Sequence, residues 1–307
     1  MSDIIFHHYD SSPFSEKVRV VFGMKNLTWN SVEIPVIMPK PDLMPLTGGY
    51  RKTPVMQIGA DIYCDTQIIL REIERRFPSP SLTKAAPGLA YGIALWTDRP
   101  FFQATIPILF GEIADFVTDE FKKDREALFP GRPFDTGEMK RAAPIMREQW
   151  RAQLAWIDDQ LADGRPYLFG DAPDLSDASA YMNVWFLRNG HRPSADRLMQ
   201  PFAHATAWAD RIAGLGHGTR KPMTGAEALD IAKAAKPTAQ TKGDAGEPNG
   251  WQPGQKVTVQ ADDYGRDPIA GEIVSISPHH VAIRRADPRV GDVVVHFPRA
   301  GFWIMPS

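Results

Sequence analysis

The stretch "SPFSEKVR", residues 12–19, joins a short apolar run to the start of a helical pattern. The preceding segment "DIIFHHY", residues 3–9, has the length and composition of a β-strand. Apolar side chains then recur at a spacing of three to four, which is typical of one buried helix face: Phe14, Val18, Val21 and Phe22. The adjacent serines Ser11 and Ser12 therefore lie in a turn before a helix. A hydroxyl there either caps the helix or takes part in chemistry.

The rest of the first 80 residues continues this alternation of strands and helices. The segment "TWNSVEIP", residues 28–35, reads as a second strand. The segments "TPVMQIG", residues 53–59, and "DIYCD", residues 61–65, predict a hairpin. The segment "TQIILREIERRF", residues 66–77, predicts the helix that closes the unit, because two prolines follow it. Residues 1–80 are therefore expected to form an α/β domain.

Composition narrows the possible functions. The chain has 307 residues, 43% of them hydrophobic, and a net charge of −2, so it lacks the basic footprint of a nucleic-acid-binding protein. Its apolar runs are shorter than the ~20 residues that span a bilayer, and we expect no membrane partner. Its start has neither the basic region nor the apolar core of a signal peptide. The single cysteine, Cys64, cannot form an intrachain disulfide, and we expect a cytoplasmic protein.

The remaining chain changes character twice. Residues 84–230 have helical periodicity and predict an all-α domain. Residues 231–250 are dominated by Lys, Ala, Pro, Thr and Gly, which predicts a linker. Residues 251–307 carry short β-branched runs separated by turn residues, which predict a small all-β domain, an SH3-like barrel. A core of that size is marginal alone, so we expect this domain to dock on the helical domain or on a partner subunit, with Trp251 or Trp303 as the anchoring side chain.

Three motifs of the α/β region each have an ordinary structural interpretation. Ser12 followed by Pro13 is typical of a helix cap with proline in the first turn. Thr53 followed by Pro54 is typical of the start of an edge strand. The pair at positions 65 and 66, Asp then Thr, is typical of another helix N-cap.

In this order and spacing the motifs resemble the glutathione transferase family, most closely its tau, zeta and omega classes. In these classes a Ser or Cys is followed by Pro-Phe or a near equivalent, then a basic residue and "VR". The downstream stretches at residues 51–78 and 167–181 agree with the same family. The resemblance implies a thioredoxin-like first domain, an all-α second domain, glutathione as co-substrate and a homodimer. It offers no account of residues 251–307.

The resemblance gives the turn a chemical role. Glutaredoxin-type proteins of this fold have cysteines where this chain has Ser12 and Ser15, so a bound glutathione must supply the sulfur. Counting back from Val18 and Arg19, Ser12 takes the position of the family's active hydroxyl. Ser11 remains the alternative. The hydroxyl would donate to the glutathione sulfur and stabilise its thiolate, whose ordinary thiol pKa is about 8.5.

The family pattern also implies how glutathione is held. The residues expected at the glutathione site, besides Ser12, are Ser11, Phe14, Lys52, Thr53, Pro54, Asp65 and Thr66. Pro54 is expected to be cis, so that the Thr53 backbone pairs with the cysteinyl backbone of glutathione. Asp65 and Thr66 would receive the γ-glutamyl carboxylate at a helix N-terminus. Lys52 either reaches the glycine carboxylate or is a solvated charge on a loop.

The resemblance further implies an activity. A hydrophobic electrophile would bind near Trp96, Arg99 and Phe102, although these residues also fit an ordinary aromatic core. We expect a detoxifying glutathione S-transferase or a thiol-dependent peroxidase. The alternative is a non-catalytic adaptor that binds glutathione and recruits a partner through the β domain.

No metal is expected, because the neighbours in His7-His8 and His279-His280 would point to opposite faces of a strand.

Overall fold

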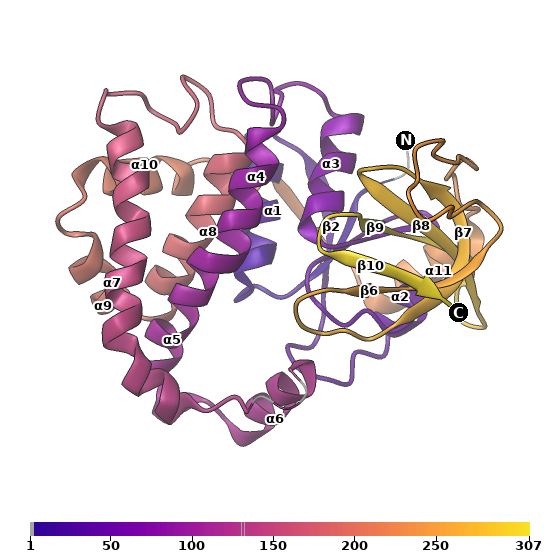
Figure 1. The fold of residues 1–307 in the computed structure, drawn as a ribbon, viewed down its shortest axis with the longest axis horizontal. Helices are drawn as coiled ribbons and strands as arrows, with labels where there is room; N and C mark the ends of the chain where they lie inside the picture. Colours follow the sequence, from indigo (N-terminus) through magenta and orange to yellow (C-terminus); the bar gives the residue numbers. More distant parts are fainter. Residues whose placement is uncertain (1–2, 130, 132) are drawn as a thin grey trace.

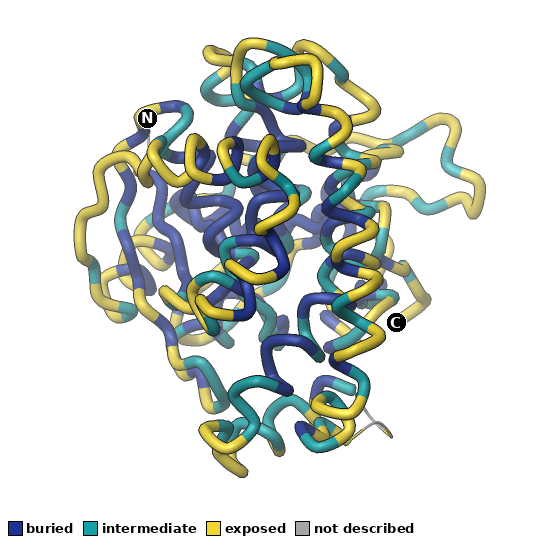
Figure 2. The backbone as a smooth tube through the Cα atoms, turned by 90° about the vertical axis from the view of Figure 1, so that its left-hand side faces the viewer, coloured by how far each residue is buried: buried dark blue, intermediate teal, exposed yellow. Residues whose placement is uncertain are grey.

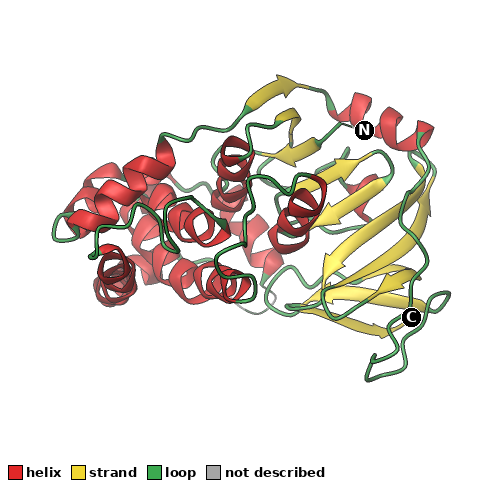
Figure 3. Cartoon of the chain, turned by 90° about the horizontal axis from the view of Figure 1, so that it is seen from above, coloured by secondary structure: helices red, strands yellow, loops and turns green. Residues whose placement is uncertain are grey.

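The computed structural model describes residues 3–129, 131 and 133–307. Helices gather on one side of the molecule and strands on the other (Figure 1, Figure 3). The chain forms a thioredoxin-like α/β domain, an all-α domain and a small all-β domain at its C-terminal end, as the sequence predicts. We call the last of these, residues 251–307, the third domain. No helix among the described residues is long and apolar enough to cross a bilayer.

The first domain has the predicted order of strands and helices. Its elements are β1 (Ile5–His8), α1 (Pro13–Met24), β2 (Thr28–Glu33), α2 (Met44–Thr47), β3 (Val55–Ile58), β4 (Asp61–Cys64) and α3 (Thr66–Arg76). Strand β1 pairs parallel with β2 and antiparallel with β3, and β3 forms the expected hairpin with β4. The apolar faces of α1 and α3 are buried.

The second domain is helical. Its elements are α4 (Leu89–Trp96), the π-helical turn η1 (Thr97–Phe101), α5 (Phe102–Glu112), the 3-10 turn η2 (Ala114–Phe116), α6 (Asp119–Leu128), α7 (Thr136–Leu161), α8 (Leu175–Gly190), α9 (Arg192–Met199) and α10 (Ala203–Ala213). Pro100 lies inside η1, where the helical path changes. Helix α8 begins at a capping box between Asp174 and Asp177.

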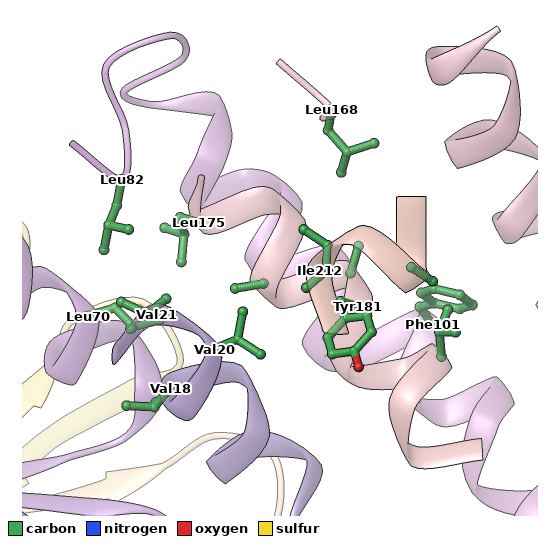
Figure 4. Packing of buried hydrophobic residues seen from close by; sticks show 14 of the residues in the cluster. Val18, Val20, Val21, Leu70, Leu82, Phe101, Leu168, Leu175, Tyr181 and Ile212 are labelled. Atoms are coloured by element: carbon green, nitrogen blue, oxygen red, sulfur yellow. The ribbon is translucent and has the colours of Figure 1, made fainter. Parts of the chain in front are cut away.

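One apolar cluster joins the first two domains. Figure 4 shows Val18, Val20 and Val21 of α1 near Leu175 and Tyr181 of α8. All five side chains are buried. Helix α1 is therefore fixed between the sheet and the helical domain, which holds the turn at its N-terminus in a defined place. In Figure 2 the buried backbone runs through the centre of the molecule, with exposed segments at its margins.

The third domain consists of β6 (Lys256–Ala261), β7 (Ile269–Ile276), β8 (His280–Asp287), β9 (Gly291–Pro298) and β10 (Phe302–Pro306). These strands are antiparallel, and β10 returns to pair with β6. Strand β9 also pairs in parallel with β4 of the first domain. A single ten-stranded sheet results, in the order β10-β6-β7-β8-β9-β4-β3-β1-β2-β5.

This pairing adds to the expected docking surface. The sequence predicts that the third domain docks on the helical domain or a partner subunit. The third domain does contact the helical domain through Asp262 and Tyr264, but its strand pairing is with the first domain. The physical reason is the edge of β4, whose backbone groups would otherwise lack a strand partner. Val295 lies opposite Ile62 in the register, and both side chains are buried in one apolar cluster. Trp251 is partly buried against that cluster, while Trp303 is 47% exposed.

The segment between the helical and third domains also differs from expectation. Strand β5 (Thr219–Pro222) pairs in parallel with β2, and helix α11 (Gly225–Ala234) packs against the first and third domains. Part of the expected helical domain thus belongs with the first sheet, and residues 231–234 of the expected linker are helical. The apolar positions Ala228, Leu229 and Ala232 explain this, because they form one buried helix face.

Candidate active site

A cavity of about 50 Å³ lies where the three domains meet. The first domain supplies Phe14, Tyr50, Lys52, Thr53, Pro54, Asp65, Thr66 and Gln67, the helical domain supplies Leu95, Asp98 and Arg99, and the third domain supplies Asp263, Tyr264, Gly301 and Phe302. Six of the residues expected to bind glutathione are therefore brought together: Phe14, Lys52, Thr53, Pro54, Asp65 and Thr66. The Thr53–Pro54 peptide is cis, as the sequence resemblance predicts.

The N-terminus of α3 forms one end of the cavity. Asp65 caps this helix, and its Oδ1 accepts a hydrogen bond of 2.8 Å from the amide of Gln67. Its backbone φ of 90° is unusual for a residue with a side chain, and such strain is often found at functional sites. Burial raises the pKa of Asp65 to about 6. A helix N-terminus favours an anion, because its first N–H groups have no partner within the helix.

A buried ion pair stands beside that helix end. The fully buried Nζ of Lys17 lies 2.8 Å from Oδ2 of Asp98 and donates to Oγ1 of Thr66 at 3.2 Å. The pair links α1, α3 and the helical domain. Burial raises the pKa of Asp98. Neither residue is among the site residues expected from the sequence, although Lys17 is the basic residue of the motif at residues 12–19.

Ser12 caps helix α1. Its side chain is buried, and Oγ accepts a hydrogen bond of 3.2 Å from the amide of Ser15. Because Oγ is the acceptor there, its own hydroxyl hydrogen remains available for donation. Ser11 is exposed. Neither serine lines the cavity, so the catalytic role of Ser12 stays a prediction.

Lys52 is not a solvated loop charge. Its side chain is 9% exposed, and Nζ lies 2.9 Å from Oδ1 of Asp263 in the third domain. The ammonium also lies 4.5 Å from the ring centre of Tyr264. Sequence reasoning missed Asp263 and Tyr264, because more than 200 positions separate them from Lys52 and no local pattern marks the contact.

The three residues expected at the electrophile pocket differ in how they lie relative to the cavity. Arg99 lines the cavity and lies 2.5 Å from Oδ1 of Asp262. Phe102 does not line the cavity, but its ring centre lies 4.8 Å from that of Phe14, which does. Trp96 is not among the lining residues. Instead it donates to Gln153 at 2.9 Å within the helical domain.

The histidine pair on β1 has no metal-binding geometry. His7 bonds to Gln57 and His8 bonds to Ser31, on opposite faces of the strand. Among the described residues, no group of three His, Cys, Asp or Glu side chains could hold a metal ion. Cys64 is buried within an apolar cluster, and burial raises the pKa of its thiol.

Comparison with known proteins identifies the family. Residues 6–81 match the model of the glutathione S-transferase N-terminal domain, and residues 110–211 match that of the C-terminal domain. A GST-like protein from Pseudomonas syringae has a solved structure that is 35% identical, with a TM-score of 0.83 and full coverage of both chains. The chain therefore belongs to the glutathione S-transferase family.

More distant structures share the fold. A glutathione S-transferase from Rhodospirillum rubrum F11 is 20% identical with a TM-score of 0.52, covering 68% of this chain and 87% of its own. The tau-class enzyme from mango, Mangifera indica, is 19% identical with a TM-score of 0.52, covering 69% and 88%. The search of curated proteins gave no match. By contrast, the similarity to the Pseudomonas syringae protein extends over the whole of both chains, including β6–β10.

Proposed function

We propose that the chain binds glutathione in the cavity at the N-terminus of α3 and activates its thiol. The observation that carries this proposal is the convergence of six expected glutathione contacts, spread from residue 14 to residue 66, on one cavity. Family membership supports the same ligand.

The charges around the cavity support one orientation of the tripeptide. The γ-glutamyl carboxylate would lie at Thr66 and the helix N-terminus, where N–H groups favour an anion. The γ-glutamyl ammonium would lie near Asp65 and Asp98. The backbone of Thr53 would pair with the cysteinyl unit as an added strand. The glycine carboxylate would then point toward Lys52.

Ser12 would act on the sulfur as a hydrogen-bond donor. A hydrogen bond to the thiolate stabilises the charged form, and each pKa unit by which the thiol is lowered corresponds to ~1.4 kcal/mol. The thiolate would form a carbon–sulfur bond to a hydrophobic electrophile, whose leaving group departs with the bonding electron pair. With a hydroperoxide, two glutathione molecules would instead be oxidised to the disulfide while the peroxide is reduced to alcohol and water.

One observation favours the alternative of glutathione binding without turnover. Ser12 is 2% exposed and is not among the residues that line the cavity, whereas a donor to the sulfur must reach it. In that alternative the chain is an adaptor, and the third domain recruits the partner.

We also propose a cytoplasmic homodimer with a role in detoxification, on the strength of the family. Strand β9 occupies the edge of β4. The surface that pairs two chains must therefore lie away from this edge.

The test is turnover with a panel of hydrophobic electrophiles and hydroperoxides, measured beside glutathione affinity. Turnover that requires glutathione and falls in Ser12→Ala supports the transferase. Saturable binding without turnover on any substrate of the panel supports the adaptor. The absence of both binding and turnover contradicts the proposal.

A further inference from the structure

Two segments of the third domain reach the cavity. In the β6–β7 loop, residues 262–268, the carboxylate of Asp263 forms an ion pair with Lys52, and that of Asp262 forms one with Arg99. The β9–β10 turn brings the carbonyl of Ala300 to within 3.3 Å of Nε2 of Gln67. The third domain therefore forms one wall of the proposed glutathione site.

The ammonium group of Lys52 lies among aromatic rings, so its charge depends on a carboxylate partner. Aromatic rings lie around the ammonium, with their centres at 4.5 Å for Tyr264, 5.7 Å for Phe302 and 5.8 Å for Tyr50. Among the described residues, Lys52 forms an ion pair with one carboxylate, that of Asp263. A cation that is largely withdrawn from water requires such a partner, because burying an unpaired charge is costly.

We propose that Asp263 is a specificity-determining residue of this site, because its carboxylate holds the position on Lys52 that the glycine carboxylate of the ligand would take. This inference rests on the proposed function. Glutathione must displace Asp263 from Lys52, so a carboxylate at the glycine end contributes less to binding than an unpaired lysine would allow.

The exposure of Asp263 allows its carboxylate to exchange with that of a ligand. The Asp263 side chain is 33% exposed, so water can solvate its carboxylate once Lys52 is released. Tyr264, the next residue, is held by stacking on Phe129 of the segment after α6, and the amide of Gly265 donates to the carbonyl of Leu128 at 2.8 Å. The cavity of about 50 Å³ is also far smaller than the ~300–1,000 Å³ typical of ligand pockets. Entry of a tripeptide thus requires the side chains that line the cavity to rearrange, and the ion pair between Asp263 and Lys52 is one of the contacts that must open.

The experiment compares two ligands that differ only at the glycine end: glutathione and its glycyl monoethyl ester. Each is titrated calorimetrically into the full-length wild type, Asp263→Asn and Lys52→Gln, and into the double variant. Asp263→Asn is expected to bind glutathione about tenfold more tightly, a change equal to about 1.4 kcal/mol, and the ester with unchanged affinity. Lys52→Gln is expected to weaken glutathione alone, and the double variant is expected to behave as Lys52→Gln does.

Two further variants keep the test decisive. Asp267→Asn removes an exposed carboxylate from the same loop and is expected to change neither affinity. Asp263→Ser repeats the removal of charge without an amide and is expected to match Asp263→Asn. Equal effects of Asp263→Asn on both ligands, or weaker binding of glutathione, would overturn the inference while leaving the proposed function intact. If wild type and all variants bind neither ligand, the proposed function fails and the inference fails with it.

Discussion

Nε2 of His296 lies 3.0 Å from Oδ1 of Asp61, across the line where β9 of the third domain meets β4 of the first. Asp61 is 1% exposed, and its Oδ2 accepts two hydrogen bonds of 2.7 Å from the amide and hydroxyl of Thr238. Burial acts to raise the pKa of Asp61, but the hydrogen bonds from His296 and Thr238 outweigh it and hold that pKa below its usual range. A buried carboxylate of the first domain thus depends on residues more than 170 positions away.

Removal of the third domain is therefore expected to destabilise the rest of the chain. A chain truncated after Lys236 loses both partners of Asp61, exposes the edge of β4 and opens the apolar cluster around Ile62. We predict a single cooperative unfolding transition for the full chain and a much lower melting temperature, or no folded state, for the truncation. Circular dichroism melting curves that coincide for the retained domains would contradict this prediction.

The contact between Asp61 and His296 has its own test. His296→Ala leaves one oxygen of the buried carboxylate without its partner, which is expected to cost about 1–3 kcal/mol in the free energy of unfolding. His279→Ala is the matched control, because His279 is exposed on the neighbouring turn and should change stability little. Urea unfolding at pH 7 measures both variants. Equal stability of the two would show that the contact is not important to the fold.

Ser12 is expected to affect both stability and chemistry. Ser12→Ala removes the cap of α1 and should lower the free energy of unfolding by about 1 kcal/mol. It should also reduce turnover about 10–100-fold, because a hydrogen bond to a charged group is worth about 1.5–3 kcal/mol. The thiolate absorbance of the glutathione complex, titrated with pH, reports the reason directly. Ser11→Ala is the control, and an unchanged thiol pKa in Ser12→Ala would refute the assignment.

His7 makes the fold sensitive to acid. Burial lowers the pKa of His7 from 6.5 to about 4. As the pH falls from 7 to 5, the unfolded chain takes up a proton at this position while the folded chain does not. Acidification therefore destabilises the fold by about 2 kcal/mol through this residue. We predict that His7→Gln, which can still bond to Gln57, loses that much less stability between pH 7 and pH 5 in urea unfolding. An equal loss in the two proteins would be inconsistent with a buried neutral His7.

Local patterns predicted the first domain and most of the helical domain. Residues 12–19 and 66–77 carry their periodicity and caps within a few positions, so the ends of α1 and α3 follow from the chain itself. The cis peptide before Pro54 followed from the family resemblance. The contact between Lys17 and Asp98 had a partial signal, because Lys17 is the basic residue of the motif at residues 12–19, but the pairing depends on how the helical domain packs.

The position of the third domain had no local signal. Strand β9 reads as β-branched and apolar from its sequence, but the choice of β4 as partner depends on which sheet edge is open in the folded chain. The contact between Asp263 and Lys52 likewise has no local signal in the sequence, because it forms only when the third domain is placed beside the first. The last residues of α11, 231–234, were assigned to the linker because of their composition, although the capping box between Thr224 and Glu227 marks where this helix begins.

Calorimetric titration of the full-length protein with glutathione tests the central claim most directly. We predict saturable binding of one glutathione per chain, weakened at least about tenfold in Thr66→Ala, which removes a hydroxyl at the N-terminus of α3. Thr241→Ala, a substitution at an exposed position outside the site, should bind as the wild type does. Absence of binding to the wild type, or equal affinity for Thr66→Ala, would contradict the placement of glutathione in this cavity.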